Sequence, residues 1–399
     1  MNHKSDLAKL VGLILLLALG AGCSSSSASS TSSVPAAKPI AAAAEASEAA
    51  IRFLEDRIKR DPDDFPAWNN LAGRYLLKLR ETGNAQWLNL AKRGAEASLK
   101  SVPAEQNPEA LHLLAQTEFA AHEFAAARDH ARKLIELENR KAYPYQLLGD
   151  ALMELGEYGA AKTAYAEMEQ RQRGGYTTLT RQARQAQLEG NNDRARRLYT
   201  DALHLASEMV PPERETVAWT HWQLGELAFS SGDYSTAEAH YRDSLMTFPN
   251  YYRALGGLAR TLAAKGDLKS AIENYERATA ILPDPVFIAA LGDLYEAAGR
   301  QPEANTQFAL LEKMAVLAAD NGEIYNRVLA QFYADHDLKS DEAYKMAQRE
   351  YEARRDIYGA DALAWTALKA GKIAEAQAAI KDALRLNTAD AKLLYHAGM

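Results

Sequence analysis

The stretch from Leu224 to Pro249 reads LGELAFSSGDYSTAEAHYRDSLMTFP, and a second copy of its pattern, LARTLAAKGDLKSAIENYERATAILP, runs from Leu258 to Pro283. Equivalent positions in the two copies hold the same leucine, glycine, aspartate, alanine and tyrosine, 34 residues apart. A constant period of this length, with small and aromatic residues at set offsets, indicates a stack of helical hairpins.

The matched residues have clear physical roles within such a hairpin. Gly232 ends the first helix, because glycine adopts a positive φ without a Cβ penalty, and Asp233 then caps the second helix. The small side chain of Ala237 lets the two helices approach closely, and Tyr241 fills the space one turn further on. Pro249 stops the second helix. One hairpin cannot bury its apolar face alone, so several must stack.

The same small residue recurs along most of the chain. Equivalents of Ala237 are found at Ala127, Ala161, Ala195, Ala271, Ala304, Ala343 and Ala376, and an earlier copy starts at Trp68. Over about residues 50–399 the pattern resembles the tetratricopeptide repeat (TPR) family. The resemblance implies an all-α, right-handed superhelix of about nine helix-turn-helix repeats plus terminal half-repeats. We expect a single solenoid domain over residues 41–399.

Two segments interrupt the repeat spacing. Residues 207–214 increase the spacing between two successive repeats and include Pro211 and Pro212. They predict that the hairpins on either side are longer or splayed. Residues 323–355 form a degenerate copy in which Asp337 stands where glycine is usual. The solenoid is therefore expected to be irregular at both places.

The N-terminus has the features of an export signal. Lys4 and Lys9 give residues 1–22 a basic start, and the apolar run Leu10–Leu19 is too short to span a membrane comfortably as a permanent helix. Cys23, the only cysteine of the chain, follows shortly after. A cysteine in this position resembles the lipobox of bacterial lipoproteins, whose sulfur receives a diacylglycerol. An ordinary secretory signal that happens to contain a cysteine is the alternative.

The lipoprotein resemblance implies a lipid anchor at Cys23. Because Ser24 rather than aspartate follows, it also implies the outer membrane of a bacterium, with the domain facing the periplasm. Residues 23–40 are rich in serine, alanine and proline and predict a disordered tether. With one cysteine in the chain, the domain folds without an internal disulfide.

Composition and motifs disfavour several classes of function. The net charge is −7 and the basic residues are spread along the helices, so we expect no nucleic-acid partner. The chain has no nucleotide-binding, zinc-protease or serine-hydrolase motif, so neither an enzyme nor a cofactor is expected. The triplet Asp335-His336-Asp337 offers metal ligands, but consecutive residues rarely converge on one ion. We predict no metal site, with the other histidines scattered on surfaces or in packed positions.

The TPR resemblance also implies where a partner binds. In that family the first helices of the repeats line a concave groove, and its groove-facing offsets fall here on Tyr143, Gln146, Asp150, Arg184, Trp219, Trp222, Glu226, Phe229, Arg253 and Arg260. Three large aromatic residues on one stripe are typical anchors for a partner, and the arginines beside them could take carboxylates. Trp219 and Trp222 could instead pack against the long helix before them.

These features predict a non-enzymatic scaffold or adaptor on the periplasmic side of a bacterial envelope membrane, with a peptide or protein in its groove. The alternative from another class is an accessory ligand- or metal-handling subunit of an envelope transport system. In that case carboxylates and histidines would bind the ligand.

Overall fold

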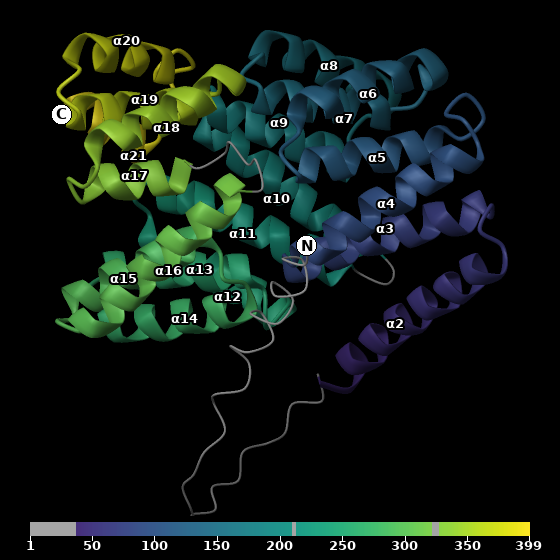
Figure 1. Ribbon diagram of the computed structural model, residues 1–399, viewed down its shortest axis with the longest axis horizontal. Helices are drawn as coiled ribbons and strands as arrows, with labels where there is room; N and C mark the ends of the chain where they lie inside the picture. The colour runs from purple at the N-terminus through teal and green to yellow at the C-terminus, as the bar shows by residue number, and fades with distance from the viewer. Residues whose placement is uncertain (1–36, 210–212, 321–326) are drawn as a thin grey trace, which may run out of the picture. The chain divides into compact units, whose positions relative to one another are not determined.

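The computed structural model describes residues 37–209, 213–320 and 327–399, and within them all regular secondary structure is helical (Figure 1). In chain order the helices are α2 (Ala37–Arg60), α3 (Phe65–Thr82), α4 (Ala85–Ser101), α5 (Pro108–Ala120), α6 (Phe124–Glu138), α7 (Tyr143–Glu154), α8 (Tyr158–Arg171), α9 (Tyr176–Leu188), α10 (Asn192–Glu208), α11 (Arg214–Ser230), α12 (Tyr234–Thr247), α13 (Tyr252–Ala264), α14 (Leu268–Ile281), α15 (Pro285–Ala297), α16 (Gln301–Asp320), α17 (Arg327–Asp335), α18 (Ser340–Ala353), α19 (Ile357–Lys369), α20 (Ile373–Ala383) and α21 (Ala391–Gly398). None of these helices is long and apolar enough to cross a lipid bilayer.

Consecutive helices pack as antiparallel hairpins, from α3 with α4 through α19 with α20, and each hairpin contacts the next. In the described residues this gives nine hairpins, with α2 and α21 as single helices at the two ends. The predicted all-α solenoid of about nine repeats plus terminal half-repeats is confirmed. The hairpins lie in one of two compact units, Ala50–Met399; the other is Met1–Ala49.

The N-terminal boundary differs from the prediction. Helix α2 begins at Ala37, so residues 37–40, which the sequence assigns to a disordered tether, are helical. Alanine has the highest helix propensity, and the run Ala41–Ala44 extends the helix toward the N-terminus, where Pro39 is tolerated in the first turn. The predicted signal peptide, Cys23 and the remainder of the tether lie outside the described residues.

The turns of the hairpins have the predicted chemistry. Gly232 has a φ of 78°, and the carboxylate of Asp233 accepts a hydrogen bond of 3.1 Å from the Thr236 amide. The next repeat has the same arrangement, with Asp267 accepting from the Ser270 amide at 3.1 Å. Asp337, which stands at the glycine position of the degenerate repeat, also adopts a positive φ of 53°. Aspartate is among the few residues that tolerate this backbone conformation.

Glycines on the first helices create the space that the tyrosines fill. The Tyr241 ring lies between Gly225 of α11 and Gly257 of α13, and a Cβ atom on either glycine would lie 2.5 Å from the ring. The ring is fully buried. Gly149 accommodates Tyr165 in the same way in the α7–α8 hairpin. The recurring small and aromatic residues of the sequence are therefore one packing unit.

The two segments predicted to be irregular each include residues that are not described, and their irregularity stays a prediction. Helices α10 and α11, on either side of residues 207–214, have 17 residues each, whereas α13 has 13. Residues 210–212 within this segment are not described. In the degenerate repeat the described first helix, α17, directly follows residues 321–326, which are not described.

The C-terminal helices contact helices that lie about 200 residues earlier in the chain, which the sequence did not indicate. One hydrophobic cluster joins Leu152 and Met153 of α7 and Leu188 of α9 to Ile357 of α19 and Leu393 of α21. Ile357 and Leu393 are fully buried in it. The solenoid is thus held together by long-range contacts as well as by neighbour-to-neighbour stacking. We call this association of α18–α21 with α7–α9 the C-terminal return.

Candidate partner-binding groove

Helices α11, α13 and α15 are the first helices of three successive hairpins, and their side chains form the part of the predicted groove that is best defined. Arg253 of α13 is exposed, and its guanidinium carbon lies 5.3 Å from the Trp222 ring centre and 5.2 Å from that of Tyr252. An arginine held over two aromatic faces offers a flat cationic surface. Trp222 itself is half-buried.

Trp219 and Trp222 both pack against the cluster of Ala218, Tyr251 and Ala254, and Trp219 also contacts α10. The Trp219 ring meets that of Tyr199 edge-on, with centroids 6.5 Å apart, and it packs beside Leu203. Tyr199 and Leu203 belong to α10, the long helix that precedes α11. Trp219 therefore packs in the contact between α10 and α11. This is the alternative that the sequence left open, in which the tryptophan packs against the long helix before it.

Glu226, Tyr241 and Arg260 form a network across two repeats. The Tyr241 hydroxyl donates to Glu226 at 2.7 Å, and Arg260 Nη2 donates to the two Glu226 carboxylate oxygens at 2.8 and 2.9 Å. Burial raises the pKa of the Tyr241 hydroxyl, and the charge of Glu226 raises it further, so the hydroxyl stays a donor. The Arg260 guanidinium also lies 4.0 Å from the Phe229 ring centre. Arg260, which we expected to be available for a partner's carboxylate, thus already binds one within the chain.

The same network recurs two repeats earlier. The Tyr165 hydroxyl donates to Asp150 at 2.8 Å, and Arg181 Nη2 donates to Asp150 at 2.7 Å. In both networks the carboxylate comes from the first helix of a hairpin, the tyrosine from its second helix and the arginine from the next hairpin. The groove offsets identified Asp150 but not Arg181, because at α9 they select Arg184 instead.

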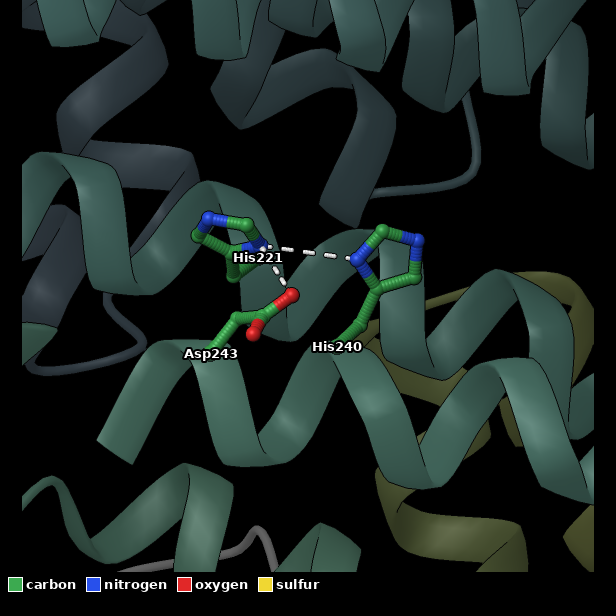
Figure 2. Close-up of side chains that lie close together, drawn as sticks. All are labelled: His221, His240 and Asp243. Atoms are coloured by element: carbon green, nitrogen blue, oxygen red, sulfur yellow. Dashed lines mark hydrogen bonds and ion pairs between the residues drawn. The ribbon is translucent and has the colours of Figure 1, made fainter. Parts of the chain in front are cut away.

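The remaining histidines are not all scattered, which corrects the sequence prediction. His221 of α11 lies beside His240 and Asp243 of α12 (Figure 2). Only the spacing of His240 and Asp243 could have indicated this group from the sequence, since residues three apart share a helix face. The third residue, His221, comes from another helix. The triplet Asp335-His336-Asp337, in contrast, contacts three separate groups: the Trp365 indole, Asp293 and Lys369.

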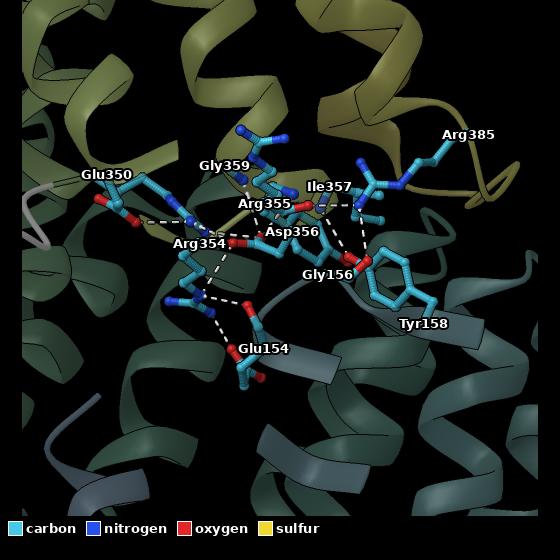
Figure 3. Close-up of polar contacts among 12 residues, drawn as sticks. Glu154, Gly156, Tyr158, Glu350, Arg354, Arg355, Asp356, Ile357, Gly359 and Arg385 are labelled. Carbon is cyan, nitrogen blue, oxygen red and sulfur yellow. Dashed lines mark hydrogen bonds and ion pairs between the residues drawn. The ribbon is translucent and has the colours of Figure 1, made fainter. Parts of the chain in front are cut away.

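The α7–α9 part of the predicted groove is bordered by the C-terminal return (Figure 3). Arg354 pairs with Glu154 at the end of α7, and the Ile357 amide donates to the Tyr158 hydroxyl at 2.9 Å. Arg184 lies against the α19 side chain Tyr358, at 5.8 Å from the ring centre, and donates to Gln187 at 3.2 Å. Arg184 therefore faces the C-terminal helices.

Two further predicted groove residues lie near the start of α7. The Tyr143 ring packs against His112 of α5, with centroids 4.4 Å apart, and Gln146 is half-buried one turn later. The Nδ1 atom of the half-buried His112 is buried without a hydrogen-bond partner, and desolvation lowers the pKa of the imidazole to about 4. This tilted contact of Tyr143 with a neutral imidazole is a contact between repeats.

A hollow of about 320 Å³ lies between α13 and α15. These are first helices of hairpins, as is α11, and the hollow follows the contact of Trp222 with Arg253 along this series of helices. Its lining is mostly apolar and consists of Arg260, Ala263, Tyr275, Ala290, Asp293, Leu294 and Ala297. The two charged members, Arg260 and Asp293, have opposite sign. Asp293 pairs with His336 at 3.0 Å, and burial raises the pKa of its carboxyl. An apolar hollow with a few charged groups suits a side chain of a bound segment.

Comparison with known proteins assigns the class. Models described as tetratricopeptide repeat match residues 142–168, 176–246 and 228–294. These residues are tetratricopeptide repeats, and the described part of the chain folds as an α-solenoid of such repeats.

Individual relatives are similar to parts of the chain. The photosystem I assembly protein Ycf3 of Prochlorococcus marinus (strain MIT 9312) is 32% identical over 97 residues, which are 23% of this chain and 56% of that protein. The chain thus spans about half the length of the curated relatives it matches. The human IFIT1 dimer, solved with m7Gppp-AAAA, superposes with a TM-score of 0.53 at 17% identity, over 84% of this chain and 76% of that one. PilF of Pseudomonas aeruginosa has a TM-score of 0.42 at 14% identity, over 52% of this chain and 90% of its own.

Proposed function

We propose that this chain is a non-enzymatic scaffold or adaptor that binds a peptide or protein segment along α11, α13 and α15. The observation that carries the proposal is the apolar hollow between α13 and α15, in line with the exposed Arg253 above Trp222. An apolar pocket beside an exposed arginine–aromatic pair is the usual composition of an energetic centre in a protein interface.

A polypeptide suits this surface better than a nucleic acid. Arg260 and Arg181 are paired with Glu226 and Asp150, so their charge is already neutralised within the groove. The net charge of −7 adds a general repulsion for phosphate backbones. The capped RNA of the IFIT1 structure is a ligand of that protein, and its likeness to this chain concerns the fold.

The relatives agree with a role in building assemblies. Ycf3 is named as an assembly protein, and its similarity covers 97 residues of this chain. Tetratricopeptide repeats present one helix face per repeat, so one partner can contact several repeats along the solenoid. We extend this to an adaptor that holds one component of a larger complex.

We further propose that the solenoid is anchored by lipid at Cys23 to the outer membrane and faces the periplasm. The support is the basic start, the apolar run Leu10–Leu19 and the single cysteine that follows. The test is labelling with radioactive palmitate and fractionation of the envelope. The wild type should be labelled and sediment with outer membranes, and Cys23→Ser should lose the label. A labelled Cys23→Ser protein, or an unlabelled wild type, contradicts the anchor.

The groove proposal is tested by photo-crosslinking in cells. A photoreactive amino acid replaces Arg253, and a matched control replaces Glu273, which is exposed on α14, the second helix of the same hairpin. The groove position should give a discrete crosslinked protein that the control position does not give. The added substitution Trp222→Ala should reduce its yield. Equal crosslinking from both positions, or none from Arg253, contradicts the proposal.

A further inference from the structure

Three potential ligand atoms meet between α11 and α12. Nδ1 of His221 lies 3.4 Å from Nδ1 of His240 and 3.9 Å from the Asp243 carboxylate (Figure 2). One ligand atom from each residue lies within 4.8 Å of the others. His240 and Asp243 are one turn apart on α12, so both side chains point toward α11.

The spacing matches the coordination sphere of a small cation. Zinc–nitrogen bonds of about 2.0–2.1 Å in a tetrahedron place the ligand atoms roughly 3.3 Å apart. The two Nδ1 atoms, at 3.4 Å, already have this separation. The Asp243 oxygen lies 3.9 Å from His221 Nδ1 and within 4.8 Å of the His240 ligand atom, so rotation of this partly exposed carboxylate must bring it closer to both.

The two imidazoles face each other through their Nδ1 atoms. With no cation between them, two neutral rings can face each other at 3.4 Å only if one Nδ1 carries the proton and donates it to the other. A bound cation lets both nitrogens offer lone pairs.

The group is accessible to solvent. The side chain of His221 is 17% exposed and that of Asp243 is 42% exposed. An ion can therefore enter, and a water molecule or a side chain of a partner can take a fourth position. Two imidazoles and one carboxylate are a ligand set of zinc sites that keep an open position.

We propose that His221, His240 and Asp243 form a site for a divalent transition-metal ion, best suited to Zn²⁺, that links α11 to α12. The ion ties together the two helices of the hairpin whose first helix carries Trp222. The site is separate from the groove, so it stands or falls independently of the proposed partner.

Zinc titration of the full chain without a histidine tag, after treatment with a chelator, tests the site. Isothermal titration should show one Zn²⁺ per chain, and His240→Ala and Asp243→Asn should each weaken binding by about tenfold or more. The matched control is His204→Ala, an exposed histidine of α10 with a carboxylate neighbour, Glu208, but no second imidazole. It should bind as the wild type does.

Cobalt provides a readout that does not depend on folding energetics. Co²⁺ in the wild type should give the visible absorption of a tetrahedral site, and His221→Ala should lose it while its far-ultraviolet circular dichroism stays helical. A wild type that binds no Zn²⁺, or a His240→Ala variant that binds it as tightly as the wild type, overturns the proposal.

Discussion

At the scale of single residues, the repeat depends on glycines that admit a tyrosine ring. Tyr241 occupies the space between Gly225 and Gly257, and its hydroxyl is bound by Glu226. The 34-residue period in the sequence was sufficient to predict this unit, because it depends on residues within one repeat and the next. The partner of the carboxylate, Arg260, could not be predicted, since an exposed arginine and a paired one look alike in a sequence.

Gly225→Ala should destabilise the protein because its Cβ atom would lie 2.5 Å from a ring that Gly257 confines on the other side. We expect a loss of about 1–3 kcal/mol in the free energy of unfolding, measured by urea denaturation. The matched control is Gly159→Ala in α8, where no atom lies within 4 Å of the new Cβ. Helix propensity makes that substitution neutral or stabilising by up to about 1 kcal/mol. Equal effects at both sites would contradict the packing unit.

His112 should make stability depend on pH. Its folded pKa of about 4 lies below the ordinary value of 6.5, so between these values the unfolded chain binds more protons than the folded chain. The stability that the neutral imidazole contributes is fully present above pH 6.5. It is lost as the pH falls toward 4, which lowers the free energy of unfolding by up to about 3 kcal/mol.

His112→Phe tests this, since phenylalanine has a similar size and no proton to bind. The decrease in unfolding free energy between pH 7 and pH 5 should be smaller in His112→Phe than in the wild type. An unchanged pH profile in the His112 variant would show that the imidazole is not held neutral by burial.

At the scale of elements, α11 presents different faces to different neighbours. Trp219 packs on α10, Trp222 lies under Arg253 of α13, and His221 meets α12. Sequence periodicity placed both tryptophans on one stripe. It could not separate them, because the path of α10 after the longer repeat step decides which tryptophan it covers. The pairing of His221 with His240 was not predicted, because the two residues lie on different helices and only the packing of α11 on α12 brings them together.

Trp219→Ala should therefore act on folding, with a loss of about 3 kcal/mol in unfolding free energy from the contact between α10 and α11. Arg253→Ala should cost no more than about 1 kcal/mol, because the side chain is exposed and its main contact is the cation–π pair. Denaturation of both variants distinguishes the two roles. If Arg253→Ala were the more destabilising, Arg253 would be a structural residue and not a binding one.

At the scale of the whole solenoid, the C-terminal return joins α7–α9 to α18–α21. It encloses Ile357 and Leu393 and brings the backbone of Arg355 against Gly156. No sequence pattern indicated it, because the contact results from small rotations accumulated over several repeats. Because of the C-terminal return, Arg184 faces Tyr358. The part of the predicted groove that is left for a partner is therefore the one formed by α11, α13 and α15.

Two glycines with the same backbone conformation test the return. Gly156 and Gly232 have φ values of 77° and 78°, but a Cβ at Gly156 would lie 2.1 Å from the Arg355 oxygen, whereas nothing lies near Gly232. Gly156→Ala should be more destabilising than Gly232→Ala by about 1–3 kcal/mol. It should also speed hydrogen exchange in α19–α21. Equal losses would mean that α18–α21 do not pack on α7–α9.

The central claim is that a partner binds along α11, α13 and α15. Hydrogen exchange of the chain, measured with and without the protein captured by the Arg253 crosslink, tests it most directly. We expect slower exchange in α11, α13 and α15 on binding, with α12 and α14 unchanged. Protection confined to α12 and α14, or to the C-terminal return, would contradict the claim.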